Sequence, residues 1–217
     1  MITLYGFRKI FPEGIGETKD LRVQWALEES GLPYRFHALD HTAGDLDTEA
    51  YGKMNPFRQV PVIDDDGYVL TESAACVLYV AEKSGALMPG DFQGRLRVTQ
   101  WCFAAVASIE PTFVTQDMLA IFGNADKHLD DEVAKLARRW LGGAEQRLDG
   151  RTWIATDAFS AADIMLTGVL RTIRKSDQLA PFPNLTAHYA RCCARPAWQK
   201  TLALSAERLG VTVESIR

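Results

Sequence analysis

The stretch Asn55-Pro56-Phe57-Arg58-Gln59-Val60-Pro61-Val62-Ile63 carries a proline inside an otherwise strand-like apolar run. Proline removes a donor from a strand ladder, so we expect an edge position or a turn with a cis peptide bond before Pro61. A strand end of this kind leaves the preceding backbone N–H and C=O groups free to pair with an extended peptide ligand. The alternative is an edge-strand proline that binds nothing.

A second stretch, Thr71-Glu72-Ser73-Ala74-Ala75, leads from a strand into a helix through an acid and a hydroxyl. Helix N-termini present free N–H groups and a partial positive charge, so they hold carboxylates well. The Glu72 carboxylate would hold an ammonium group. Glu72 and Ser73 together therefore have the chemistry to bind both ends of an α-amino acid, and the alternative is ordinary helix capping.

A third stretch, Phe159-Ser160-Ala161-Ala162-Asp163-Ile164, has the pattern of a structural motif. Ser160 as N-cap with Asp163 three residues later predicts a capping box, and Phe159 facing Ile164 predicts a hydrophobic staple. We expect Asp163 to set the start of a buried helix and to take no part in catalysis.

Other chemical motifs are incomplete. The tract Gly14-Ile15-Gly16 is not followed by a third glycine three residues on, and the sequence contains no Walker A pattern. The four histidines are scattered, and we interpret each as a surface or hydrogen-bonded residue before a catalytic base. The cysteines form no CxxC pair and no zinc pattern, so we expect four reduced thiols and no metal: Cys76, Cys102, Cys192 and Cys193.

The chain that carries these stretches changes character near residue 90. Before it, short apolar runs predict strands, and Asp65-Asp66-Gly67 predicts a hairpin turn. We expect strands at 2–5, 34–39, 60–64 and 68–71, and helices at 21–30 and 72–84 that end at Gly31 and Gly85. An opening strand–helix–strand unit followed by a hairpin and a helix gives a mixed sheet with helices against it.

After residue 90 the strand signals nearly vanish. Helical patterns cover 92–122, 130–148, 160–175, 184–194 and 197–209. Pro111 is expected to kink or divide the first of these helices. The predicted fold class is α/β plus all-α, with an N-terminal domain at 1–84, a linker at 85–91 and an all-helical domain at 92–217.

Composition narrows the class of protein. The 217 residues are 47% hydrophobic and 24% charged, with a formal net charge of -4. The apolar fraction is ample for a core, and the acidity argues against a nucleic-acid binder. The longest apolar run, at 74–81, falls far short of the ~20 residues of a membrane span. With no signal-peptide pattern at the N-terminus, we expect a cytoplasmic protein that binds neither nucleic acid nor membrane.

The order NPFRQVPVI, TESAA and FSAADIML resembles the pattern of the glutathione S-transferase superfamily, of the bacterial, cytosolic type. The opening LYG and the helix LRVQWALEESGLPY also resemble the family's first strand and helix, so the resemblance covers essentially the whole chain. It implies a thioredoxin-like N-terminal domain with a four-stranded mixed sheet, an all-helical C-terminal domain and a homodimer.

Carried over position by position, the resemblance implies a binding site for glutathione. Val60 would pair its backbone with the cysteine of glutathione, with Pro61 cis. Glu72 and Ser73 would bind the γ-glutamyl ammonium and carboxylate, and Gln59 would touch the same part of the ligand.

The chain departs from the family pattern where the glycyl carboxylate of glutathione is usually held. Family members often place basic or polar side chains in the segment before the NPF motif, but this segment, Gly44-Asp45-Leu46-Asp47-Thr48, is acidic. The candidate replacements are His41, Lys53 and Arg58.

The first loop is the larger departure. Family members usually carry a catalytic Ser, Cys or Tyr in a short loop, whereas this chain has a longer loop at 7–18 without Ser or Cys. The lack of Cys argues against the members that form a mixed disulfide there. Counting back from Leu21-Arg22-Val23 places Thr18 at or beside the family's hydroxyl, with an N-cap as its alternative role. Tyr5 sits near the position that tyrosine-type members use and is the rival donor.

The resemblance implies a glutathione transferase with a detoxification role, which activates the thiol of its co-substrate glutathione for attack on a small hydrophobic electrophile. The electrophile is expected in a cleft between the domains lined by Phe7, Ile10, Phe11, Phe113 or Met118. The alternative is a non-catalytic glutathione-binding or regulatory and assembly module on the same fold. The unusual first loop and the acidic segment favour this alternative, while Val60-Pro61 and Glu72-Ser73 favour glutathione binding in either case.

Overall fold

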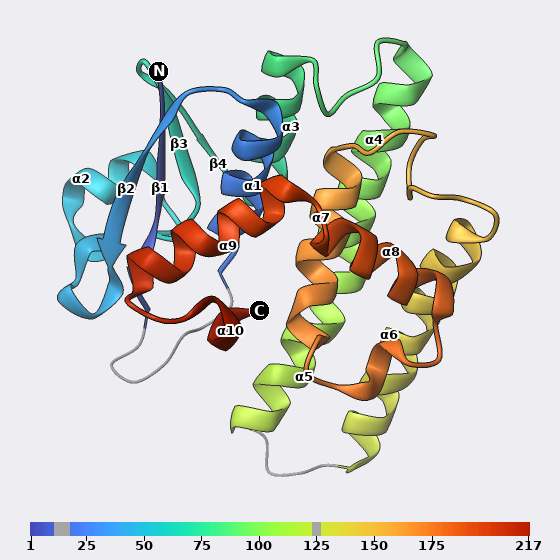
Figure 1. Cartoon of the computed structure of the whole chain (residues 1–217). Coiled ribbons are helices and arrows are strands. Elements are labelled where there is room, and N and C mark those ends of the chain that lie inside the picture. The colour runs from blue at the N-terminus through green and yellow to red at the C-terminus, as the bar shows by residue number, and fades with distance from the viewer. Residues whose placement is uncertain (11–17, 123–126) are drawn as a thin grey trace. The chain divides into compact units, whose positions relative to one another are not determined.

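The computed structural model describes residues 1–10, 18–122 and 127–217. The chain divides into two compact units (Figure 1). The sheet unit combines Met1–Met88 with Ala194–Arg217, and the helical unit comprises Pro89–Cys193. Phe11 and the Gly14-Ile15-Gly16 tract, both discussed above, lie outside the described residues.

The sheet unit is built on a four-stranded mixed sheet, as the sequence predicts. Its strands are β1 (Ile2–Lys9), β2 (Tyr34–Asp40), β3 (Val62–Asp65) and β4 (Tyr68–Thr71), in the order β2-β1-β3-β4. β1 and β2 are parallel and are connected through α1 (Asp20–Ser30), while β1–β3 and β3–β4 are antiparallel. The predicted hairpin turn joins β3 to β4, and Gly31 and Gly85 end their helices in the left-handed conformation.

Two strand boundaries differ from the predicted ones by more than one residue. β1 continues beyond Tyr5 because Gly6 and Phe7 still pair with β2, opposite Ala38 and Leu39. The first part of the predicted loop is therefore strand. β3 begins at Val62 and not at Val60, because Pro61 has no N–H to give to the ladder.

The two faces of β1 contact different helices, since successive side chains of a strand point to opposite faces. Tyr5 and Phe7 pack into a cluster with Tyr51 of α2 (Glu49–Met54), Leu39 and Val62. Gly6, on the opposite face, lies against Asp20 at the start of α1. α3 (Ser73–Ser84) packs beside α1.

The C-terminal helix α9 (Pro196–Leu209) belongs to the sheet unit, where it lies along α1 (Figure 1). The Trp25 and Trp198 rings contact each other at a tilt of 51°, with centroids 4.8 Å apart. Arg195 holds Glu29 through two hydrogen bonds of 2.6 and 2.8 Å. These contacts group residues 194–217 with the sheet unit, whereas the sequence places them in a helical domain at 92–217. The short α10 (Val213–Ile216) follows.

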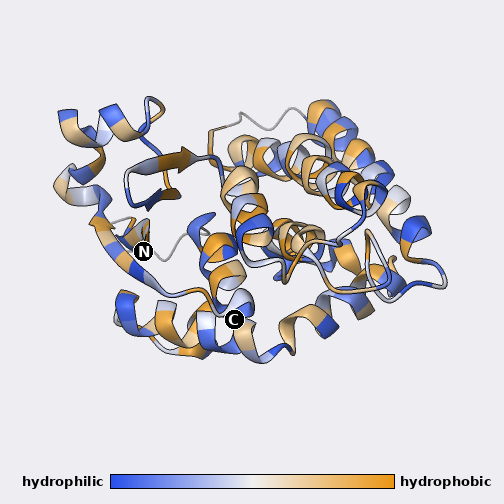
Figure 2. Ribbon diagram, turned by 90° about the horizontal axis from the view of Figure 1, so that it is seen from above, coloured by the Kyte–Doolittle hydropathy of each residue, from blue (hydrophilic) through white to orange (hydrophobic). Residues whose placement is uncertain are grey.

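The helical unit contains α4 (Phe92–Phe103), α5 (Glu110–Phe122), α6 (Lys127–Leu148), α7 (Ala161–Leu170) and α8 (Pro183–Cys193). Hydrophobic and hydrophilic residues alternate along most helices of the chain, as expected of helices that turn one face to a core (Figure 2). α7 differs, because nearly all of its residues are buried. The division expected near Pro111 is a π-helical segment, Ala104–Ile109, between α4 and α5. Pro111 lies in the first turn of α5, where its missing N–H is tolerated.

The predicted capping box at the start of α7 is confirmed. Asp163 is fully buried, and its carboxylate accepts the Ser160 N–H at 2.9 Å and the Ile154 N–H at 2.9 Å. It also lies 2.9 Å from Nε2 of the buried His188 in α8. One carboxylate therefore joins the start of α7, the preceding loop and a neighbouring helix.

We predict that Asp163→Ala destabilises the protein without changing its chemistry. The substitution leaves several buried donors without an acceptor, and each costs about 1–3 kcal/mol, more than the ~1 kcal/mol of a simple cap. Urea unfolding should show this loss, while activity per folded molecule stays unchanged. Asp157→Ala, a control in the loop before α7 with an exposed side chain, should leave stability as it is. A stable but inactive Asp163→Ala variant would contradict the structural role.

Candidate functional site

Strand register brings the predicted site residues to one end of the sheet. Val62 lies opposite Tyr5 of β1 and opposite Thr71 of β4. β3 is antiparallel to both neighbours. Pro61 and Val60, which precede it, therefore lie beside Gly6 and Phe7 on one side and beside Glu72 on the other. Segments far apart in the sequence meet here: the end of β1, the start of β3 and the start of α3.

The turn before β3 is held in place by side chains from α2. The Gln59 carbonyl accepts hydrogen bonds from the Tyr51 hydroxyl at 2.8 Å and from Asn55 Nδ2 at 2.7 Å. The Val60–Pro61 peptide bond is cis, as predicted. Within the described residues, the Val60 N–H and C=O have no hydrogen-bond partner. The site therefore offers a fixed piece of backbone with open N–H and C=O groups, while the Gln59 side chain is exposed.

Glu72 and Ser73 stand at the N-terminus of α3, which is the position that the sequence predicts for them. Glu72 occupies the N-cap position but makes no side-chain cap hydrogen bond. Its carboxylate is exposed, whereas the Ser73 side chain is 5% exposed and sits where α3 presents free N–H groups. The capping alternative therefore does not account for Glu72.

Glu72 also holds an unfavourable backbone conformation, with φ of 68° and ψ of 118°. A non-glycine residue at positive φ costs on the order of 1–3 kcal/mol, and such residues cluster at binding and active sites. The β3–β4 register places Glu72 beside Pro61, the residue after Val60. This geometry suits a ligand that carries both a peptide backbone and an ammonium group.

Thr18 precedes α1 and is half-buried. The N-cap position of α1 belongs to Lys19, without a side-chain cap hydrogen bond, so the structure does not use Thr18 as the predicted N-cap. The Thr18 hydroxyl instead lies beside the carboxylate of Asp20, whose pKa it lowers. Asp20 in turn lies against Gly6, so Thr18 is close to the end of β1.

Tyr5, the rival donor, lies on the other face of β1. Its ring contacts His37 with centroids 4.7 Å apart and Tyr51 with centroids 6.4 Å apart, inside the apolar cluster over α2. This packing favours a structural role for Tyr5. Which of the two hydroxyls serves as a donor stays a prediction.

The basic residues proposed to hold the glycyl carboxylate already contact other groups of the sheet unit. Arg58 Nη1 donates to the Leu46 and Thr48 carbonyls, both at 2.9 Å. Lys53 pairs with Glu49 at 2.7 Å on the surface of α2. His41 remains exposed beside Phe7, with ring centroids 6.0 Å apart.

The side chains expected to line an electrophile site differ in burial. Phe113 is 1% exposed and Ile10 8% exposed, so both are core residues here. Met118 is 55% exposed. Phe7 packs in the cluster over α2.

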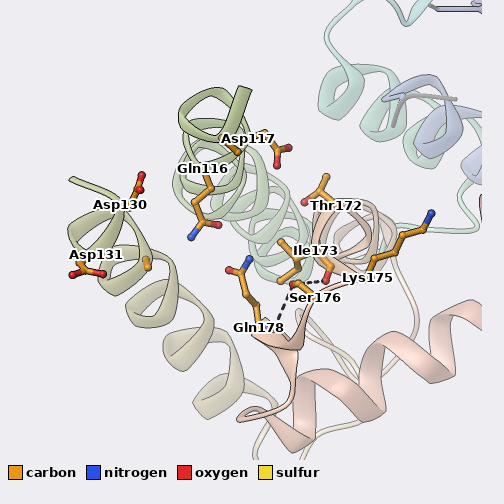
Figure 3. Close-up of a pocket in the computed structure, with 11 residues that line it drawn as sticks. Gln116, Asp117, Asp130, Asp131, Thr172, Ile173, Lys175, Ser176 and Gln178 are labelled. Atoms are coloured by element: carbon orange, nitrogen blue, oxygen red, sulfur yellow. Dashed lines mark hydrogen bonds between the residues drawn. The ribbon is translucent and has the colours of Figure 1, made fainter. Parts of the chain in front are cut away.

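The helical unit has a separate hollow of about 540 Å³ between α5, α6 and the turns after α7 (Figure 3). Acids from α5 and α6 line it together with Lys175. Ser176 lies in it too, but its hydroxyl donates to the Ile173 carbonyl at 2.8 Å and so serves the local turn. None of the predicted site residues lines this hollow.

The sequence reasoning missed Asp20, Tyr51 and Asn55. Tyr51 and Asn55 hold the turn before β3, and an asparagine before Pro56 is a turn signal that could have indicated this. Asp20 is the first residue of α1 and is 1% exposed. An acid in the first turn usually faces solvent, so no local signal marks Asp20 as buried.

Comparison with known proteins assigns the family. The description "Glutathione S-transferase, N-terminal domain" matches residues 21–83, and "Glutathione S-transferase, C-terminal domain" matches residues 100–196. The glutathione S-transferase hmp2 of Hypomyces subiculosus is 28% identical over 196 residues, which cover 84% of this chain and 92% of that protein. A glutathione S-transferase of Xanthomonas campestris pv. campestris is 29% identical, with 84% and 91% covered.

Solved structures agree with this assignment. A glutathione transferase from Burkholderia graminis, with two glutathione molecules bound per subunit, has 31% identity and a TM-score of 0.81, covering 92% of this chain and 86% of its own. A family member from Pseudomonas fluorescens, with two glutathione bound, has 28% identity and a TM-score of 0.82, with 92% and 91% covered. The chain belongs to the glutathione S-transferase superfamily, as its motifs predict. No helix among the described residues is long and apolar enough to cross a membrane.

We predict that a comparison of Glu72→Gly with Glu72→Ala separates two effects of Glu72, namely its backbone strain and its contribution to glutathione binding. Both remove the carboxylate, so both should weaken glutathione binding by about 1.5–3 kcal/mol, measured by calorimetry. Only Glu72→Gly relieves the positive φ, so it alone should raise the melting temperature. Glu82→Ala, an exposed acid on the same helix, is the matched control and should change neither property.

We expect Ser73→Ala to weaken glutathione binding to a similar extent, because it removes a hydroxyl at the N-terminus of α3. The fold should be retained, as judged by circular dichroism. If glutathione affinity is unchanged in both Ser73→Ala and Glu72→Ala, the proposed γ-glutamyl site is wrong.

Proposed function

We propose that this protein is a glutathione transferase that activates the thiol of glutathione for attack on a hydrophobic electrophile. The observation that carries the proposal is the open backbone of Val60 next to the strained Glu72 and to Ser73 at the start of α3. A γ-glutamyl peptide has complementary groups: backbone for Val60, an ammonium for Glu72 and a carboxylate for the helix N-terminus.

The proposed reaction needs the thiolate near neutral pH, whereas a free thiol has a pKa of about 8.5. A hydroxyl donor and the positive end of a helix both stabilise the charged form. Thr18, just before α1, offers both. The thiolate then attacks a carbon of the electrophile and forms a thioether, while that carbon loses its leaving group or, in an addition, the electrophile takes up a proton.

The alternative is a glutathione-binding module without turnover. The acidic segment at 44–48 is one of the two features that favour this alternative. The structure gives one of its acids, Asp45, a structural role instead. Asp45 accepts the Asp40 N–H at 2.8 Å, and Asp40 in turn caps the short helix His41–Ala43. Retention on a glutathione column followed by conjugation assays on a panel of electrophiles tests the two: binding without any turnover would favour the module.

We also propose that the protein is a cytoplasmic homodimer. Large apolar side chains are exposed on both units, which is typical of an interaction surface: Phe57 at 71%, Phe92 at 67%, Leu96 at 53% and Phe103 at 57%. Four cysteines without disulfides suit a reducing compartment. Sedimentation velocity would test the dimer, and substitution of Phe57 or Phe103 by Ser should weaken it.

Thr18→Ala should raise the pKa of bound glutathione and lower turnover by about 10- to 1000-fold, the range for loss of one preorganised donor. Thr18→Ser should keep most activity, because it retains the hydroxyl. The absorbance of the bound thiolate, followed against pH, is the direct measurement. If Tyr5→Phe shifts this titration and Thr18→Ala does not, the role belongs to Tyr5.

A further inference from the structure

Asp20 is a buried acid next to the proposed thiol site. It is 1% exposed, and neither carboxylate oxygen has a hydrogen bond of ordinary geometry within the described residues. A Cβ at Gly6 would lie only 2.5 Å from Oδ2, so the strand must have glycine here for the carboxylate to fit. Burial of a carboxylate without such bonds is costly and calls for a functional reason.

Among the residues that the structure describes, few charged or titratable groups face this carboxylate. The Arg208 guanidinium of α9 lies 3.8 Å away, and the phenol of Tyr51 interacts with it at longer range. Burial raises the pKa of Asp20, while the Thr18 hydroxyl and Arg208 act in the opposite direction. The ionised form is therefore a stronger base than an exposed aspartate.

Arg208 is itself fixed by its surroundings. Its Nε donates to the Phe7 carbonyl at 3.0 Å, its Nη2 donates to Gln24 at 3.2 Å, and its guanidinium lies 3.6 Å from the centre of the Phe36 ring. It therefore supplies a positive charge at a fixed position, close to Asp20 but without a direct hydrogen bond to it.

The site for the thiol lies within reach of this group. In the β1–β3 register Gly6 lies beside Pro61. Pro61 directly follows Val60, whose backbone is proposed to bind the cysteine of glutathione. Asp20 lies against that same Gly6, and the Thr18 hydroxyl lies beside Asp20. Thr18 precedes α1 by two residues, so its hydroxyl belongs to the same helix start that places Asp20 against Gly6.

We propose that Asp20 accepts the proton that glutathione loses, passed on through the Thr18 hydroxyl. This inference rests on the proposed function. The thiol S–H bond breaks and its proton goes to Thr18 Oγ1, while the hydroxyl proton goes to the Asp20 carboxylate. The products are a thiolate and a neutral carboxylic acid, so the site exchanges one anion for another. After the thiolate attacks, Asp20 returns the proton to the product or its leaving group.

The competing explanation is structural, because an acid in the first turn of a helix stabilises it through the helix dipole. The two explanations differ in what Asp20→Asn changes. A dipole role predicts a lower melting temperature and an unchanged titration of the bound thiol. The proton-acceptor role predicts little loss of stability, because a costly buried charge is removed, and a changed proton balance on binding.

The experiment measures how many protons are released to solvent for each glutathione thiolate that forms on binding. Calorimetry of glutathione binding in two buffers of different ionisation enthalpy gives the protons released, and ultraviolet absorbance gives the thiolate formed. In the unmodified protein we expect clearly less than one proton released per thiolate. In Asp20→Asn we expect one proton released per thiolate, and kcat/KM at neutral pH on the order of 100-fold lower. Asp130→Asn, the same change at an exposed first-turn position of α6, should match the unmodified protein.

Thr18→Val provides a second test that does not depend on the folding of Asp20→Asn. It removes the hydroxyl with little change in side-chain volume, so the proton can no longer pass to Asp20. At a pH where glutathione bound to this variant forms a thiolate, one full proton per thiolate should therefore reach the solvent. If the unmodified protein and the variants all release one proton per thiolate, the proton-acceptor role of Asp20 is wrong. That result leaves the transferase proposal intact. Absence of glutathione binding by the unmodified protein overturns both.

Discussion

The close approach of α1 to β1 at Gly6 is the constraint on which the candidate site depends. Only a strand without a side chain at this position leaves room for the Asp20 carboxylate. That fit sets the start of α1, and therefore Thr18, against the end of β1. The same strand end lies next to the turn before β3, so a single glycine links the helix start to the open backbone at Val60. A bulkier residue would move the helix and separate the two halves of the site.

The C-terminal segment completes this arrangement from the other end of the chain. α9 packs on α1 through the contact of two tryptophan rings and the Glu29–Arg195 pair, and it brings Arg208 to the Phe7 carbonyl. A charge from residue 208 thus acts on a site whose other members lie before residue 74. The two units of the chain are for this reason not simply its first and second parts.

Binding geometry in the site is obtained at a cost in stability. Glu72 holds a positive φ, and Asp20 keeps a carboxylate out of water, both of which oppose folding. Asp163 in the helical unit shows the opposite case, because its buried carboxylate contacts Ser160, Ile154 and His188. These two unfavourable features lie where a ligand would bind, as is usual in binding and catalytic proteins.

The sequence by itself determined the features that depend on neighbouring residues. It predicted the order of strands and helices, the hairpin, the glycine helix ends, the capping box at Ser160 and Asp163, and the family pattern at Pro61 and Glu72. Only the tertiary structure decided the length of β1, the place of residues 194–217 and the surroundings of Thr18 and Asp20. Periodicity and capping patterns report the contacts a segment makes with itself or with water. The burial of Asp20 depends instead on a glycine in β1 and an arginine in α9, and such distant contacts leave no local pattern to read.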